Sequence, residues 1–122
     1  MLLVDTSVWV DHLREPDRDL VEALGDARVL GHPAVVGEVA LGSLPRRQEV
    51  LSALDGLPSA VPASDDEARL LLERHRLWGR GVGWVDLHLL ASVRLTAGAS
   101  LWTRDRRLRR AAEALGVAAD LP

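Results

Sequence analysis

The sequence has no cysteine, and all 15 of its basic residues are arginine. Without cysteine, disulfides, thiolate zinc sites and cysteine nucleophiles are excluded. Without lysine, the chain cannot use a phosphate-loop lysine, a Schiff-base lysine or a serine–lysine dyad. Phenylalanine and tyrosine are also absent, which disfavours a protein that binds single strands by stacking bases on an aromatic platform.

Long apolar runs are missing as well. No stretch of about 20 apolar residues occurs, so the sequence predicts no membrane-spanning helix. The N-terminus has no basic segment and reaches Asp5 at once, which disfavours a secretory signal and favours the cytoplasm. With 122 residues, 48% of them hydrophobic, we expect a single domain over residues 1–122 with one core. That core is expected to include three tryptophans: Trp9, Trp84 and Trp102.

Short apolar segments alternate with segments of helical periodicity. Strands are expected at residues 2–5, 28–31, 59–61, 100–103 and 117–119. Helices are expected at residues 6–15, 17–24, 33–44, 45–54, 64–75, 85–96 and 105–115. This alternation indicates an α/β fold with a parallel sheet covered on both faces.

Four acidic residues end or interrupt apolar segments: Asp5, Glu38, Asp86 and Asp105. Asp5 and Asp105 follow predicted strands, and the other two lie in early turns of predicted helices. Ligands of open parallel sheets gather beyond the carboxyl ends of the strands, so all four could face one edge. An ionised carboxylate in an apolar site must be paired, protonated or bound to a metal. If the four converge, a hard divalent cation such as Mg²⁺ or Mn²⁺ is the natural partner.

Each acid also has a purely structural interpretation. Asp5 could simply favour the positive end of the helix that follows it, and Asp105 could cap its own helix. Glu38, expected to be buried, could be satisfied by Ser43 or by an arginine. Asp86 is the sharpest signal, because it lies in the first turn of a helix that is apolar almost all round.

Three hydroxyl residues stand beside the acids: Thr6, Ser7 and Thr103. Their side chains could orient the carboxylates or hold metal-bound water. Helix capping is an equally good explanation for Thr6 and Ser7. The four histidines show no metal-binding spacing.

The net charge is −3, but arginine is concentrated near the C-terminus, where residues 104–110 hold five of them. An acidic centre with basic flanks can bind a polyanion. Alternatively, the arginine-rich segment is only the solvated face of a helix.

Taken in order, four segments resemble the motifs of the PIN-domain family, and in particular of its VapC-type toxins of type II toxin–antitoxin pairs. These segments are LVDTSVWVD from Leu3, EVALG from Glu38, GWVDLHLLA from Gly83 and TRDRRL from Thr103. The resemblance covers essentially the whole chain. One departure is that many members carry a second Asp and a Phe where this chain has Arg107 and Leu108.

The resemblance implies a PIN-like three-layer α/β/α sandwich with a central, mainly parallel, short-stranded sheet. It also implies a metal-dependent endoribonuclease that uses Mg²⁺, with Mn²⁺ as the alternative ion, at an acidic pocket. Asp5, Asp86 and Asp105 would then be metal ligands, and Glu38 would bind a second ion or orient the attacking water.

The resemblance further implies an RNA substrate, a homodimer and a VapB-type antitoxin that covers the acidic groove. Arg80, Arg104 and Arg106 are then the candidate RNA-binding residues.

Three other interpretations compete with this one. A catalytically silent PIN-like module would bind RNA or a protein without cutting. A haloacid-dehalogenase-like phosphatase would use Asp5 as nucleophile, but it needs an Asp where Ser7 stands and a lysine that is absent. A DNA flap nuclease generally carries more acids and a helical arch, for which the chain has no room.

Overall fold

Three short parallel strands form the centre of the computed structural model, which describes residues 1–122. They are β1 (Leu2–Val4), β2 (Val29–Leu30) and β3 (Ser100–Trp102), in the spatial order β2-β1-β3. Strand β1 is parallel to both neighbours, with Leu3 opposite Leu30 on one side and Leu101 on the other. All three residues of β1 are buried, which explains why its sequence is a continuous apolar run.

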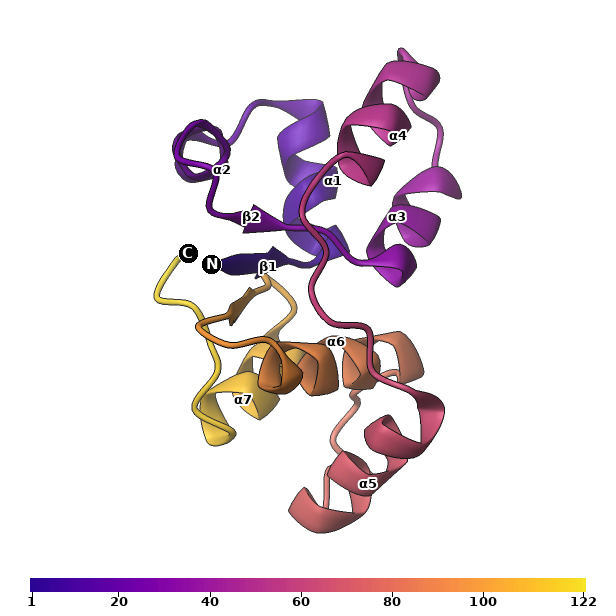
Figure 1. The fold of residues 1–122 in the computed structure, drawn as a ribbon, viewed down its shortest axis with the longest axis vertical. Coiled ribbons are helices and arrows are strands. Elements are labelled where there is room, and N and C mark those ends of the chain that lie inside the picture. The colour runs from indigo at the N-terminus through magenta and orange to yellow at the C-terminus, as the bar shows by residue number, and fades with distance from the viewer.

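Seven helices surround the strands: α1 (Thr6–Arg14), α2 (Arg18–Gly25), α3 (Pro33–Ala40), α4 (Arg47–Asp55), α5 (Asp65–His75), α6 (Trp84–Leu95) and α7 (Arg106–Ala114). Figure 1 shows α1 to α4 gathered on the β2 side of the strands and α5 to α7 on the β3 side. The predicted α/β fold with a parallel sheet is confirmed.

Several predicted boundaries were wrong. The helix expected over residues 33–44 ends at Ala40, and the next helix begins at Arg47 rather than at residue 45. The residue before α4, Arg46, has a left-handed backbone with φ 52°, which separates the two helices.

Two segments expected to be strands form only single bridges. Ser59 pairs with Gly31, and Ala118 pairs with Leu101, in both cases in parallel. Residues 59–61 lie between Pro58 and Pro62, which have no backbone N–H to donate to a ladder.

The core is one cluster of 27 buried hydrophobic residues. Helix α6 contributes more than one face to it, because its residues 89–93 are all buried. Trp9 and Trp102 are buried as expected. The expectation for Trp84 was wrong: 49% of it is exposed, because it is the first residue of α6, and its ring meets the edge of His88.

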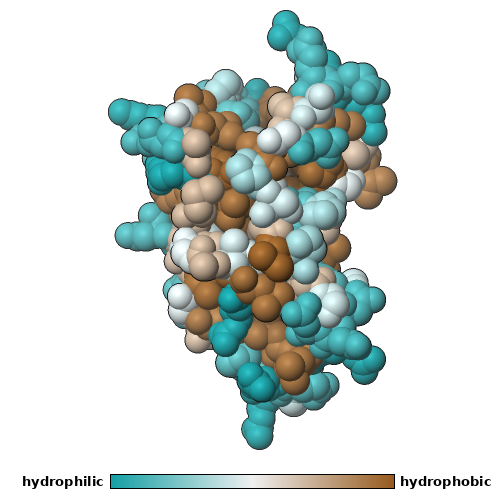
Figure 2. Space-filling view, viewed as in Figure 1, coloured by the Kyte–Doolittle hydropathy of each residue, from teal (hydrophilic) through white to brown (hydrophobic).

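The surface is mixed. Figure 2 shows polar side chains at the extremities of the molecule and apolar side chains in patches between them. None of the seven helices has the length and apolar character needed to cross a lipid bilayer.

Candidate active site

Asp5 lies at the carboxyl end of the central strand and caps helix α1. Its backbone N–H donates to the carbonyl of Trp102 at 2.9 Å, which continues the pairing of β1 with β3. The carboxylate is buried, with 5% of the residue exposed. Its Oδ2 accepts hydrogen bonds from Ser7 Oγ at 2.7 Å and from Thr103 Oγ1 at 2.8 Å. A buried charge is tolerated here because hydroxyl groups hydrogen-bond it directly.

The same hydroxyl groups connect Asp5 to the segment that follows β3. Thr103 is buried, and its Oγ1 accepts the backbone N–H of Asp105 at 3.1 Å. Ser7 Oγ accepts the backbone N–H of Arg104 at 3.0 Å. The N-terminal strand end and the C-terminal strand end are therefore joined by side-chain hydroxyls.

Asp105 caps α7, as its structural interpretation proposed. Its Oδ1 accepts the backbone N–H groups of Arg107 at 2.9 Å and Leu108 at 3.0 Å. The residue is exposed, so capping uses one carboxylate oxygen and leaves the other free.

Glu38 differs most from the expectation. It was expected to be buried and is exposed, because the buried residues of α3 are Val35 and Val39 and Glu38 lies off that face. Neither Ser43 nor an arginine is its partner. Its Oε1 accepts a hydrogen bond from Thr6 Oγ1 at 2.8 Å, which ties α3 to the start of α1.

Asp86 is the third residue of α6, and its Oδ2 accepts the backbone N–H of Gly83 at 3.1 Å. Burial raises the pKa of Asp86, and the negative charges of Asp5, Asp105 and Glu38 raise it further, against the lowering effect of the Gly83 N–H. Four acids from distant parts of the chain therefore act electrostatically at one place.

The donor set of this acidic pocket is all oxygen, which fits a hard divalent cation. Each of the four carboxylates has one oxygen that accepts no hydrogen bond. The carboxylate oxygens of Asp5 and Asp86 that accept no hydrogen bond are accessible to solvent. No group of three acidic or histidine side chains is already close enough to hold one ion directly. The residues fit a cation that is held partly through water, or one that draws the carboxylates together.

Arg104, a candidate RNA-binding residue, is already engaged within the protein. Its guanidinium pairs with Asp11 at 2.8 Å and with Asp17, donates to the carbonyl of Pro122 at 3.0 Å, and lies 5.6 Å from the centre of the Trp102 ring. The hydrogen bond from Arg104 lowers the pKa of Asp17. Sequence reasoning missed this network, because partners 87 and 93 residues apart leave no local signal.

The other two arginine candidates are free of such partners. Arg80 lies in the loop before α6, and Arg106 is the first residue of α7. Both are exposed, and neither takes part in a salt bridge.

Comparison with known proteins agrees with this arrangement. The sequence profile of the PIN domain matches residues 2–114, a range that includes all four acids. Two curated relatives are each called "Ribonuclease VapC32" and come from Mycobacterium tuberculosis, strains CDC 1551 / Oshkosh and H37Rv. Each is 52% identical over 118 residues, which cover 97% of this chain and 95% of the relative. By the extent of both matches, the chain belongs to the PIN-domain family and is of the VapC type.

Proposed function

We propose that this protein is a metal-dependent endoribonuclease that acts as the toxin of a type II toxin–antitoxin pair. The observation that carries the proposal is the acidic pocket, where burial, and after it the charges of three other carboxylates, raise the pKa of Asp86. Carboxylates that repel one another in this way are stabilised by a bound cation. The curated relatives, which are named as ribonucleases, support RNA as the substrate.

In this proposal Asp5, Asp86 and Asp105 hold a Mg²⁺ or Mn²⁺ ion, and Glu38 binds a second ion or orients the attacking water. A bound ion of this kind makes water a stronger nucleophile and offsets the negative charge that develops on the phosphate. The chain has no lysine and no cysteine, so carboxylates are the main groups available for this chemistry.

The hydroxyl residues have a positioning role. Ser7 and Thr103 hold Oδ2 of Asp5, so that its orientation is fixed by two hydroxyls, and Thr6 holds Oε1 of Glu38. Side chains held by such bonds lose little freedom when a ligand binds, which favours a well-ordered site.

Three partners follow from the proposal: an RNA substrate, a second copy of the chain in a homodimer, and a VapB-type antitoxin. The antitoxin would cover the acidic pocket and place a basic side chain among its carboxylates, because a cationic group compensates the same charge as a metal ion.

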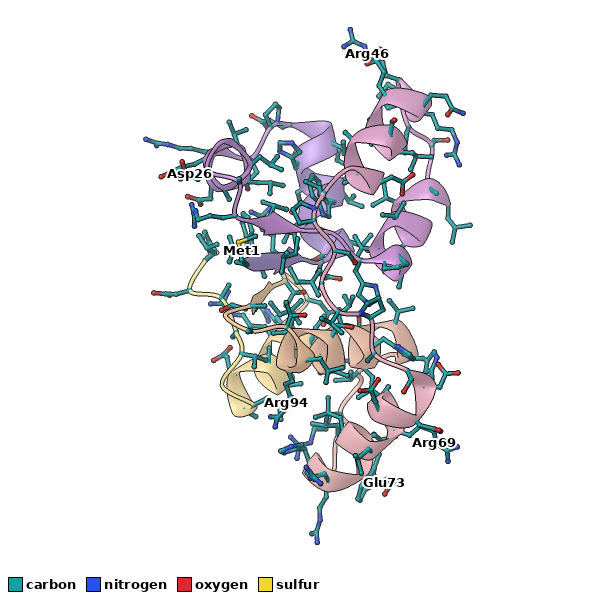
Figure 3. The ribbon with its side chains drawn as sticks, in the orientation of Figure 1. Met1, Asp26, Arg46, Arg69, Glu73 and Arg94 are labelled. Atoms are coloured by element: carbon teal, nitrogen blue, oxygen red, sulfur yellow. The ribbon has the colours of Figure 1, made fainter.

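The decisive experiment is cleavage of a defined pool of cellular RNAs by the purified protein with Mg²⁺, with Mn²⁺ and with EDTA. Asp86→Asn is tested in parallel, with Asp26→Asn as the control, since Asp26 is an exposed acid in the turn after α2 (Figure 3). We expect discrete fragments that require metal and Asp86 and are unaffected by the Asp26 change. Folded, partner-free protein that cuts nothing with either metal would leave the silent binding module as the better interpretation.

A further inference from the structure

Three arginines surround an open cavity beside the acidic pocket. The cavity has a volume of about 320 Å³ and is lined by Arg80, Arg107, Arg110 and Ala111. No carboxylate lines it, and none of the three arginines forms a salt bridge or donates a side-chain hydrogen bond. Three guanidinium groups therefore share one opening without a negative partner, an arrangement that favours binding of an anion.

One of these arginines, Arg107, lies directly against the loop before α6. Gly81 has φ 74°, and a Cβ on it would lie 2.4 Å from Cδ and 2.9 Å from Nε and Nη1 of Arg107. Only glycine lets the Arg107 side chain cross the loop at this distance. The exposed side chain of Arg107 therefore runs along the loop, and any side chain at position 81 would push its end aside.

The same two segments carry two of the four acids. The backbone N–H of Arg107 donates to Asp105, so the arginine belongs to the first turn that Asp105 caps. Gly81 lies two residues before Gly83, whose N–H holds Asp86. The contact between Gly81 and Arg107 therefore joins the loop leading to Asp86 to the helix start at Asp105.

We propose that Arg80, Arg107 and Arg110 bind a backbone phosphate of the RNA strand, next to the phosphodiester that lies over the acids. This inference rests on the proposed ribonuclease function and deepens it. Arg107 and Arg110, which have no partner in the protein, take the place of Arg104 as RNA-binding candidates, because the guanidinium of Arg104 is engaged by Asp11 and Asp17. Guanidinium groups bind phosphate oxygens in a bidentate manner, and such contacts position a strand without reading its sequence.

The test measures binding of a labelled single-stranded RNA of mixed sequence in EDTA, which prevents metal-dependent cleavage, over a range of salt concentrations. Variants are Arg107→Gln, Arg110→Gln and Arg80→Gln. The control is Arg69→Gln, since Arg69 points outward from α5, outside the cavity (Figure 3). Removing one phosphate contact from a single strand lowers the slope of log K against log salt by about 0.7, which is about fivefold in affinity at about 0.1 M salt. We expect these losses for the cavity arginines, equal across RNA sequences, and none for Arg69→Gln.

A fourth variant uses the loop instead of the charge. Gly81→Ala keeps all the arginines, but its methyl group must displace Arg107, so we expect it to weaken RNA binding as Arg107→Gln does. Thermal unfolding of each variant is measured alongside. Arg80→Gln and Arg110→Gln change exposed side chains and remain informative if Gly81→Ala does not fold.

The outcomes separate this inference from the proposed function. If the cavity variants bind RNA as tightly as Arg69→Gln with the same salt slope, the inference is wrong, even if the wild type cuts RNA. If the wild type cuts nothing while the cavity variants lose RNA binding, the nuclease proposal fails and the phosphate site stands. An acidic peptide is tested in the same binding assay. If the cavity variants lose affinity for this peptide but bind RNA as the wild type does, the arginines serve a protein partner and the inference is overturned.

Discussion

Asp5 and Asp86 carry the same charge in the same pocket, yet the protein surrounds them differently. Asp5 is buried and hydrogen-bonded by the hydroxyls of Ser7 and Thr103, which we call the hydroxyl side of the pocket. Asp86 accepts one backbone N–H, from Gly83, and burial together with the charges of three carboxylates raises its pKa; we call it the loop side. The fold supplies hydroxyl donors to the Asp5 carboxylate, whereas its surroundings disfavour the charged form of Asp86. The hydroxyl side thus holds its carboxylate in one orientation, and the cation of the proposed function would have its larger electrostatic effect on the loop side.

The largest expected effect on folding is loss of the central hydroxyl. Thr103→Val removes a donor to buried Asp5 and the acceptor for the N–H of Asp105. Leaving buried polar groups unpaired costs about 1–3 kcal/mol, so we expect a clear fall in the free energy of unfolding measured in urea. Thr6→Val, which removes the hydrogen bond to exposed Glu38, serves as the control and should change stability by less than about 0.5 kcal/mol. Equal losses in the two variants would break the comparison.

A second variant tests the ion pairs of Arg104, whose backbone N–H donates to Ser7 on the hydroxyl side. Arg104→Gln removes the ion pairs with Asp11 and Asp17, and with the exposure of these groups taken into account we expect a loss of about 1–2 kcal/mol at pH 7. The hydrogen bond from Arg104 lowers the pKa of Asp17 below its ordinary 3.8. The stability from this pair is therefore fully present above pH 3.8 and is lost as the pH falls through the lower folded-state pKa. Urea unfolding of both proteins at pH 7 and near pH 3 should show the difference shrinking, and a constant difference would argue against the pair.

A third prediction concerns Asp86 on the loop side, where we expect the substitution to stabilise the protein instead of destabilising it. The folded-state pKa of Asp86 is raised, so the fold disfavours its charged form above that pKa. Without metal, Asp86→Asn should raise the melting temperature at pH 7 by a few degrees, and the gain should disappear as the pH falls toward 3.8. Added Mg²⁺ should raise the melting temperature of the wild type, with a much smaller effect on the variant. A variant less stable than the wild type at pH 7 without metal would contradict the assignment.

The smallest effect concerns a buried group that is neutral instead of charged. His32 caps α3 through Nδ1, and its Nε2 lies 3.0 Å from Ser92 Oγ. Burial lowers its pKa, with a further contribution from His88. Its contribution to stability is full above pH 6.5 and is lost as the pH falls through the lower folded-state pKa. In an NMR titration, the His32 imidazole signal, assigned with His32→Gln, should move only below pH 6.5.

The sequence was sufficient to predict the strands that matter most and the helices around them. Asp5 and Asp86 stand out because each breaks an apolar segment, a pattern that survives without any knowledge of contacts. The exposure of Glu38 and Trp84 was missed because both lie within apolar stretches, while the direction of a side chain depends on which helix face meets the core. The partners of Arg104 and the Gly81 contact of Arg107 were missed because they are made across the chain.

The hydrogen bond between Asp5 and Thr103 joins residues 98 positions apart. During synthesis at about 5–20 residues per second, about 5–20 s pass between the addition of Asp5 and the addition of Thr103. Until then neither β3 nor the end of the chain is there to complete the pocket, and Asp5 has only half of its hydroxyl donors. An unfinished chain on the ribosome thus lacks an assembled acidic pocket. Because the first and last acids of the pocket follow adjacent strands, the proposed nuclease would have no complete site until translation of the protein is nearly finished.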